Sequence, residues 1–322
     1  MIKKLLIVLG VLVVAIAAGV PGWFYLAHPK TRPAPDMEAP DSPSAVERGR
    51  YLAEALTGCP ACHSPIDESR PGDFPVADML YAGRTFTGAF SGTIVAPNLT
   101  PDPETGIGAW TDGEIVRAIR EGVSRDGRPL FPLMNYPHYR DLSDEDVLAI
   151  VAYLRTMKPI RHDAGRTRLD FPVNVLIRTL PRPVEGSPAG YPPPGIERGR
   201  MMLDVMLCGE CHTPMERGTP VAGMELAGGT AMSGAWGTVY SANITSHPSA
   251  GIGAFSDEDL KRVFREGRNR AGRPLWVMPW SVTQNLTDED MDSLIAALRE
   301  IPPNPNLVLA PELREQPPSG AQ

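Results

Sequence analysis

The sequence predicts an all-α protein in which two tandem domains of one plan follow an N-terminal membrane helix. Three observations predict this fold class. The motif Cys-x-x-Cys-His occurs twice, at residues 59–63 and 208–212, the sequence around the first copy recurs around the second, and an uncharged run lies near the N-terminus. The 322 residues are enough for two modest domains.

The N-terminal segment is apolar enough to cross a bilayer. Lys3 and Lys4 are followed by 23 uncharged residues, 5–27, and about 20 apolar residues span a membrane. The lysines favour the cytoplasmic side, which sends the rest of the chain across. We therefore expect residues 1–27 to be a transmembrane anchor or, because Ala15-x-Ala17 resembles a cleavage site, a signal peptide. Both alternatives place the domains in the periplasm, anchored to the inner membrane in the first and soluble in the second.

Proline content divides the remainder of the chain. Proline is abundant, at 35 residues, and much of it clusters between and after the apparent domains, where it indicates extended connections. The expected segments are a Pro-rich tether at 28–45, domain one at 46–159, a Pro-rich linker at 160–195, domain two at 196–301, and a Pro-rich tail at 302–322. The net charge is −7 and no basic run suits nucleic acid, so we expect no nucleic-acid partner.

The two Cys-x-x-Cys-His motifs use all four cysteines: Cys59, Cys62, Cys208 and Cys211. Two cysteines three positions apart lie within one helical turn, so both sulfurs can bond to vinyl groups on one side of a porphyrin. The histidine that follows, His63 or His212, can then reach the iron as the proximal ligand. The pattern predicts two covalently bound haem c groups. A thioredoxin-like site would not need the histidines, and a Cys₄ zinc site would leave them unexplained.

The two halves repeat each other beyond the haem motifs. The paired segments are 46–50 with 196–200, 92–100 with 237–245, 106–112 with 251–257, and 120–122 with 265–267. Thr111 and Ser256 are expected N-caps of a helix that ends at a glycine. A second helix closes each half after Ser143 or Thr287, with apolar residues at i, i+3, i+4 and i+7.

Each repeat also offers a distal iron ligand. Met134 and Met278 lie at equivalent positions, directly before the closing helix and 71 and 66 residues after their histidines. A lone methionine is usually core filler, but two in register favour a ligand role. His/Met ligation raises the reduction potential of a haem. His138 is the competing ligand in the first half, and it has no counterpart in the second.

The Gly-Thr-Ile-x-x-Pro-Asn-x-Thr-Pro-Asp-Pro-x-Thr-Gly-Ile-Gly-x-Trp stretch from Gly92 to Trp110 carries a family resemblance. Together with the haem motifs, it resembles the class I cytochrome c domains of the membrane-associated cytochrome subunits of bacterial alcohol, gluconate and aldehyde dehydrogenases. The resemblance implies two tandem cytochrome c domains. It also implies a dehydrogenase as electron donor, and a quinone, cytochrome or oxidase as acceptor. Members of that family usually have Met-Pro at the distal ligand, whereas this chain has Met134-Asn135.

These observations predict an electron-transfer cytochrome that is not itself an enzyme, because two six-coordinate haems leave no open iron. The alternative is a dihaem cytochrome c peroxidase-like enzyme with one open haem. A thiosulfate-oxidising dihaem protein would require a His or Cys as distal ligand, and the chain has no spare cysteine.

Overall fold

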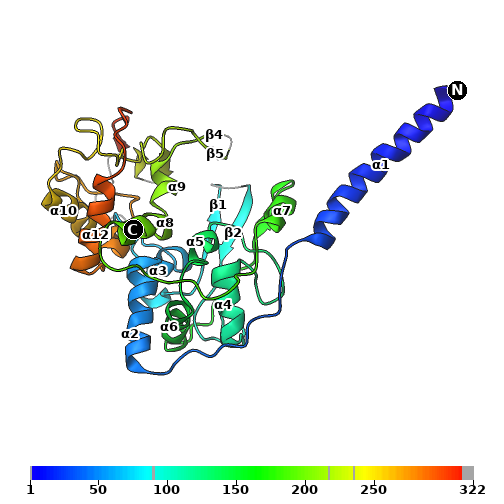
Figure 1. Ribbon diagram of the computed structural model, residues 1–322, viewed down its shortest axis with the longest axis horizontal. Coiled ribbons are helices and arrows are strands. Elements are labelled where there is room, and N and C mark those ends of the chain that lie inside the picture. The colour runs from blue at the N-terminus through cyan, green and yellow to red at the C-terminus, as the bar shows by residue number, and fades with distance from the viewer. Residues whose placement is uncertain (1, 89–90, 217, 235, 314–322) are drawn as a thin grey trace, which may run out of the picture.

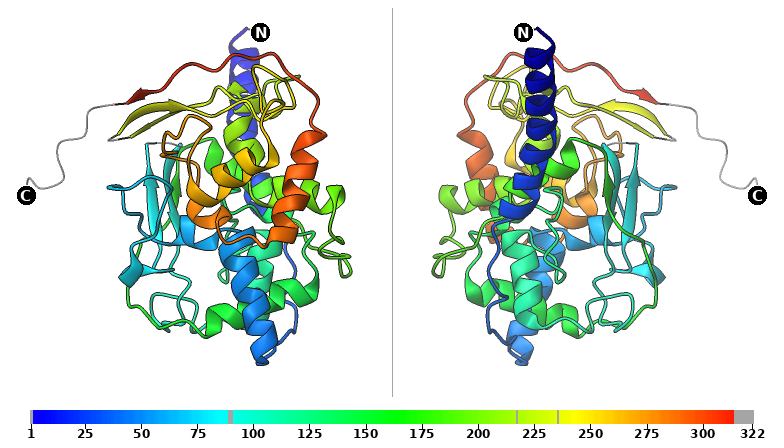
Figure 2. Two further views of the ribbon diagram at one scale, coloured as in Figure 1. Left: turned by 90° about the vertical axis from the view of Figure 1, so that its left-hand side faces the viewer. Right: turned by 90° about the vertical axis from the view of Figure 1, so that its right-hand side faces the viewer.

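The computed structural model describes residues 2–88, 91–216, 218–234 and 236–313. A long helix, α1 (Ile2–Ala27), projects away from the rest of the chain, which forms two packed halves lying side by side (Figures 1 and 2). The segment Ile2–Val20 of this helix has a mean hydropathy of 2.3 and is long and apolar enough to cross a membrane. At its foot, Arg178 lies 4.5 Å from the centre of the Tyr25 ring and donates to the carbonyl of His28.

The first half is built from short helices around one antiparallel hairpin. Its helical elements are α2 (Pro43–Tyr51), η1 (Leu52–Leu56), α3 (Cys59–His63), η2 (Ala77–Met79), α4 (Asp112–Glu121), α5 (Tyr136–Tyr139) and α6 (Asp144–Arg155). The connecting region that follows holds α7 (Val173–Leu176) and η3 (Ile177–Thr179).

The second half repeats this order. Its helices are α8 (Ile196–Val205), α9 (Cys208–His212), α10 (Asp257–Glu266), α11 (Trp280–Thr283) and α12 (Asp288–Arg299). In both halves the first helix packs against the last, as α2 on α6 and α8 on α12. The apolar stripes of α6 and α12 are buried in this packing.

A glycine permits each helix crossing. A Cβ atom on Gly49 would lie 1.8 Å from the carbonyl oxygen of Ala149, and one on Gly199 would lie 2.0 Å from that of Ser293. Both obstacles are backbone atoms of the closing helix, so no side-chain rotation could relieve them. The absence of a side chain at these positions is what allows the helices to approach.

One extra residue separates the helices of the first half. Gly49 lies ten residues before Cys59, whereas Gly199 lies nine before Cys208. The π-helical turn η1 absorbs the extra residue while keeping the hydrogen-bonded path continuous, as π-bulges do.

The capping residues expected from the sequence are confirmed. Thr111 and Ser256 each accept from the backbone N–H three residues on, and Glu114 and Asp259 complete capping boxes. Ser143 and Thr287 cap the closing helices in the same way. The capping boxes satisfy two backbone N–H groups at the start of α4 and of α10, and the single caps satisfy one at the start of α6 and of α12.

The expectation of an all-α fold is wrong. Only 39% of the chain is helical, and three antiparallel sheets are present in the described residues. The strands are β1 (Arg84–Thr87), β2 (Gly92–Ala96), β3 (Arg168–Leu169), β4 (Met215–Glu216), β5 (Thr219–Pro220), β6 (Ala231–Gly234), β7 (Gly237–Tyr240) and β8 (Glu312–Leu313). The physical reason lies in the β-branched residues of segments such as Thr93-Ile94-Val95, which favour an extended backbone.

The Pro-rich connections contribute to these sheets. β3, in the segment after the first half, pairs with β2, and β8, in the segment after the second half, pairs with β7. Residues 314–322 of the expected Pro-rich tail lie outside the described residues. The linker and the tail, where they are described, therefore each pack on the half that precedes them.

Candidate haem sites

Each Cys-x-x-Cys-His motif forms a single helical turn, α3 or α9. The residue before each turn has a left-handed backbone, with φ of 60° at both Gly58 and Leu207. This conformation is free for glycine but costs a non-glycine residue about 1 kcal/mol. Its recurrence at Leu207 shows that the turn geometry is imposed by the motif and its surroundings rather than by local preference.

Both motif histidines use one ring nitrogen in the same way. The Nδ1 of His63 lies 2.8 Å from the carbonyl oxygen of Pro97, and the Nδ1 of His212 lies 2.7 Å from that of Ala242. A carbonyl oxygen only accepts hydrogen bonds, so each Nδ1 carries the hydrogen and donates it. The lone pair of each imidazole is therefore on Nε2, which is free to bind a metal.

Burial keeps these imidazoles neutral. It lowers the pKa of His63 from its usual value to about 4, and lowers the pKa of His212 as well. The hydrogen bond to the carbonyl acts in the opposite direction but is the smaller effect. Near neutral pH both rings have the protonation state of a metal ligand.

An asparagine fixes each accepting carbonyl. The Oδ1 of Asn98 accepts from the backbone N–H and the hydroxyl of Thr100, at 2.9 and 2.8 Å. Asn243 and Thr245 repeat the arrangement at 3.0 and 2.6 Å. The amide nitrogens reach into the following connection, to the carbonyls of Ile160 in the first half and Asn304 in the second.

The residue after each histidine is also anchored. The hydroxyl of Ser64 accepts from the N–H of Tyr81 at 2.9 Å, and that of Thr213 accepts from the N–H of Leu226 at 3.0 Å. The sequence alone assigned no role to these two hydroxyl residues or to Asn98 and Asn243. Their signal was the repeat itself, since each recurs at the same place in both halves.

The surroundings of the cysteines favour the neutral thiol over the reactive thiolate. Burial raises the pKa of Cys59 to about 11 and that of Cys208 to about 12. Thioredoxin-like sites require the opposite shift. No group of three or more His, Cys, Asp or Glu side chains gathers in a metal-binding arrangement among the described residues. The geometry therefore favours neither the redox-dithiol nor the Cys₄ zinc alternative.

Met134 and Met278 lie on equivalent loops, each of which is hydrogen-bonded to the glycine that ends α4 or α10. Leu130 N–H donates to the carbonyl of Gly122 at 2.8 Å, and Leu275 N–H donates to that of Gly267 at 2.8 Å. Both methionines are partly buried against the hydrophobic core, as is Cys59. Their ligation to iron stays a prediction.

An aromatic ring two residues after each methionine packs over a glycine. A Cβ on Gly122 would lie 2.6 Å from the ring of Tyr136, and one on Gly267 would lie 2.1 Å from the ring of Trp280. Both glycines have positive φ, 71° and 61°, and end their helices. Each glycine thus ends a helix and makes room for the ring that holds the methionine loop.

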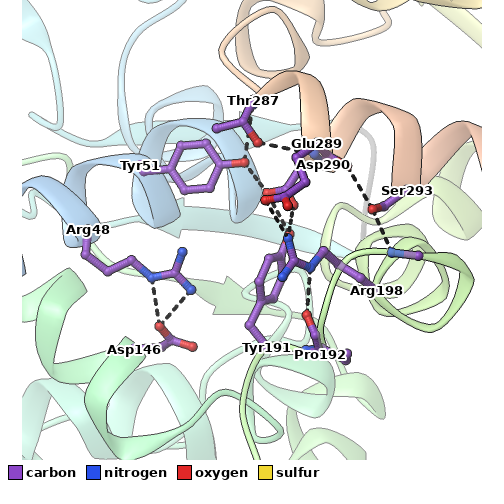
Figure 3. Close-up of polar contacts among 11 residues, drawn as sticks. Arg48, Tyr51, Asp146, Tyr191, Pro192, Arg198, Thr287, Glu289, Asp290 and Ser293 are labelled. Atoms are coloured by element: carbon purple, nitrogen blue, oxygen red, sulfur yellow. Dashed lines mark hydrogen bonds and ion pairs between the residues drawn. The ribbon is translucent and has the colours of Figure 1, made fainter.

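The two halves meet through a buried carboxylate, Asp290, at the start of α12 (Figure 3). Its Oδ1 accepts from Arg198 at 3.0 Å. Its Oδ2 accepts from the hydroxyls of Tyr51, in the first half, and Tyr191, in the connection, the latter at 3.1 Å. The Tyr191 ring lies within cation–π distance of the guanidinium groups of both Arg48 and Arg198.

The comparisons with known proteins agree with this arrangement. Residues 46–158 match the family model described as Cytochrome c. The chain is 33% identical over 292 residues to the fructose dehydrogenase cytochrome subunit of Gluconobacter japonicus, which covers 86% of this chain and 57% of that protein. It is 30% identical over 285 residues to the cytochrome c subunit of a quinone-type alcohol dehydrogenase from Gluconacetobacter polyoxogenes, with 83% and 58% covered.

A third relative matches most of its own length. The dihaem c-type cytochrome of Cereibacter sphaeroides is 32% identical over 252 residues, which is 76% of this chain and 82% of the relative. The chain spans less than two thirds of either dehydrogenase subunit. A cytochrome c domain implies covalently bound haem c and a role in electron transfer. The chain therefore belongs to the c-type cytochromes, in the group that includes the cytochrome c subunits of fructose and alcohol dehydrogenases.

Proposed function

We propose that the chain holds two haem c groups, one in each half. Cys59 and Cys62 would form the thioethers of the first, and Cys208 and Cys211 those of the second. The axial pairs would be His63 with Met134 and His212 with Met278. The observation that carries the proposal is the duplicated histidine geometry, in which Nδ1 donates to a carbonyl and Nε2 remains available in both halves.

Haem c supplies a one-electron ferric/ferrous couple when bound. The residues of the chain set the properties of that couple. The carbonyls of Pro97 and Ala242 orient the imidazoles and make them more basic. A methionine thioether is a soft, neutral ligand that favours ferrous iron and raises the potential.

The proposed function is electron transfer in the periplasm rather than catalysis at iron. The donor would be a dehydrogenase, as the names of the relatives indicate, and the acceptor a quinone, another cytochrome or a terminal oxidase. The helix α1, if retained, would anchor the chain at the periplasmic face of the inner membrane. If it is cleaved as a signal peptide, the chain would be a soluble periplasmic carrier.

The ligand assignment is tested by removing each methionine. Met134→Ala and Met278→Ala should each abolish one of two near-infrared Fe–S(Met) bands of the oxidised protein and lower one reduction potential. Met157→Ala is the matched control, because Met157 is also partly buried against the core but ends the closing region of the first half. The control should keep both bands.

The same spectra distinguish the carrier from an enzyme. A wild-type protein with one five-coordinate high-spin haem and peroxide turnover would contradict the proposal and favour a dihaem peroxidase. The dehydrogenase step is tested separately, by isolating the chain from its membranes and adding the substrate of any co-purified dehydrogenase. Reduction of the haems is expected, and haems that stay oxidised would remove that dehydrogenase as donor.

A further inference from the structure

The interface between the halves has an approximate symmetry. The helix α5, which follows Met134, packs against α8 of the second half, and Figure 1 draws the two side by side. The equivalent helix α11, which follows Met278, packs against η1 of the first half. In each case a methionine loop of one half meets the segment that leads into the Cys-x-x-Cys-His motif of the other.

Asn135 makes the first of these contacts. Its side-chain Nδ2 donates to two backbone carbonyls at the end of α8, those of Asp204 at 3.2 Å and Val205 at 3.1 Å. Carbonyls in the last turn of a helix have no partner within the helix, so a side-chain amide can satisfy them. Asn135 is 2% exposed, which leaves the amide little access to water.

Beside the packing of α11 on η1, the Met278 loop is bonded to the backbone of residues 72–73 of the first half, which follow the Cys-x-x-Cys-His motif of that half. The N–H of Gly72 donates to the carbonyl of Trp276 at 3.1 Å, and the N–H of Ser281 donates to the carbonyl of Gly72 at 3.3 Å. The hydroxyl of Ser281 donates to the carbonyl of Asp73 at 3.0 Å. Trp276 and Ser281 lie on either side of Met278, so the loop is held at both ends.

The contact from Asn135 accounts for a departure in the sequence. The equivalent residue of the second half is Pro279, which has no side-chain donor and follows the Met-Pro pattern of the family. An asparagine directly after Met134 is needed where the loop must bond to the other half. The end of α8 lies three residues before Cys208, so this bond joins the distal side of one haem site to the attachment side of the other.

We propose that the two halves position each other's distal methionine loops, with Asn135 holding the Met134 loop on α8 and Ser281 holding the Met278 loop on residues 72–73. Asn135 and Ser281 are positioning residues, and the inference rests on the proposed His/Met ligation. A loop released from the other half would leave its methionine less well placed on iron. Release at Asn135 would also free the end of α8 ahead of the second haem motif.

The experiment uses the full-length holoprotein and isolates one band at a time. In a Met278→Ala background the remaining near-infrared band reports Met134, and Asn135→Ala should weaken it and lower the potential of that haem. Loss of two neutral hydrogen bonds should raise the population with a released loop about tenfold. Asn135→Asp keeps the volume but faces carbonyl oxygens with a carboxylate, and it should weaken the band at least as much.

Ser281→Ala is the matched variant for the other loop. In a Met134→Ala background it should weaken the band from Met278, by less than Asn135→Ala weakens that from Met134, because it removes one bond rather than two. A second readout needs no iron ligand: amide hydrogen exchange of residues 206–208 should quicken in Asn135→Ala and not in Ser281→Ala.

The outcomes separate this inference from the proposed function. If Met134→Ala abolishes its band but both Asn135 variants leave band, potential and exchange unchanged, the positioning role is wrong and the ligation stands. If Met134→Ala keeps both bands, the ligand assignment fails and the positioning role fails with it.

Discussion

The same arginine–aspartate pair occurs at equivalent places in the two halves but has different surroundings. In the first half, Arg48 bonds Asp146 at 3.0 Å, joining the first helix to the last. In the second half, Arg198 bonds Asp290 at 3.0 Å in the same role. The first pair keeps its arginine side chain 37% exposed, whereas the second has an arginine 13% exposed and an aspartate 3% exposed.

The difference arises from two tyrosine hydroxyls that bond the aspartate of the second pair, Asp290 (Figure 3). Tyr51 and Tyr191 both donate to Asp290, whereas no tyrosine hydroxyl in the described part of the chain donates to Asp146. Tyr51 has Met201 as its counterpart in the repeat, which cannot donate. The bond within the second half is therefore also the point where both halves and their connection meet, whereas the bond within the first half is not.

The largest expected loss of stability comes from replacing the glycine at the helix crossing, and it should be similar in the two halves. Gly49→Ala or Gly199→Ala would drive a methyl group into a backbone carbonyl of the closing helix. We expect each to destabilise its half by about 3 kcal/mol or more, at the upper end of overpacking effects. Urea unfolding of the holoprotein measures this. Wild-type stability in either variant would show that the helix crossing is looser than the structure has it.

Replacing the aspartate of each pair, Asp290 or Asp146, should lower the stability of the protein by different amounts. Asp290→Ala leaves the Tyr51 and Tyr191 hydroxyls without their acceptor and removes one partner of Arg198, which keeps Glu289, so we expect a loss of about 3 kcal/mol. Asp146→Ala leaves an arginine that water can reach, so we expect about 1 kcal/mol. Equal losses in urea unfolding would mean that the tyrosines add nothing to the second pair.

Removing a single hydroxyl should have a smaller effect. Tyr51→Phe deletes one hydrogen bond to the Asp290 carboxylate while keeping the ring, and bonds to charged groups contribute about 1.5–3 kcal/mol. Burial, followed by this carboxylate, raises the pKa of Tyr51 to about 12. The loss should vanish when Tyr51→Phe is made in an Asp290→Ala background, where the acceptor is already gone, and an unchanged loss there would place the effect elsewhere.

The smallest effect concerns pH and a loop that only the first half extends. In each half a glycine N–H donates to the backbone carbonyl of the motif histidine and closes a loop. Gly83 comes 20 positions after His63 in the first half, and Gly228 comes 16 positions after His212 in the second. This loop carries Asp73, whose pKa burial raises to about 6, against the nearby Arg84. The folded state thus holds the proton at a higher pH than the unfolded state does.

Stability should therefore be highest below the unfolded pKa of about 4 and fall as the pH rises through about 6. Asp73→Asn removes this dependence, and asparagine tolerates the left-handed backbone at this position. We expect the variant to be more stable by about 1 kcal/mol at pH 7 and unchanged at pH 4. Thermal unfolding across this range checks it, and a variant less stable at pH 7 would contradict the sign.

Much of this architecture was accessible from the sequence because local patterns determine it. The caps at Thr111 and Ser256 involve residues three apart, and the Cys-x-x-Cys-His turns are contained within five. The crossing glycines, Gly49 and Gly199, could be recognised because the repeat places each before a haem motif. Comparison of the two halves predicted more of these features than residue propensities for helix or strand did.

The features that sequence reasoning missed depend on distant partners. β8 is two residues long, too short for any periodicity, and exists only because it pairs with β7. Asp290 meets Tyr51 across 239 positions, and no pattern near either residue marks the contact. The role of Asn135 was likewise hidden, since a departure from Met-Pro reads as a weaker ligand motif until α8 is seen beside it.

Haem stoichiometry tests the central claim, that each half is a complete haem site, most directly. A pyridine haemochrome assay of the purified chain should give two covalently bound haems per polypeptide. The double variants Cys59→Ser/Cys62→Ser and Cys208→Ser/Cys211→Ser should each retain one. A wild-type chain with a single covalent haem, or a double variant that keeps both, would contradict the account.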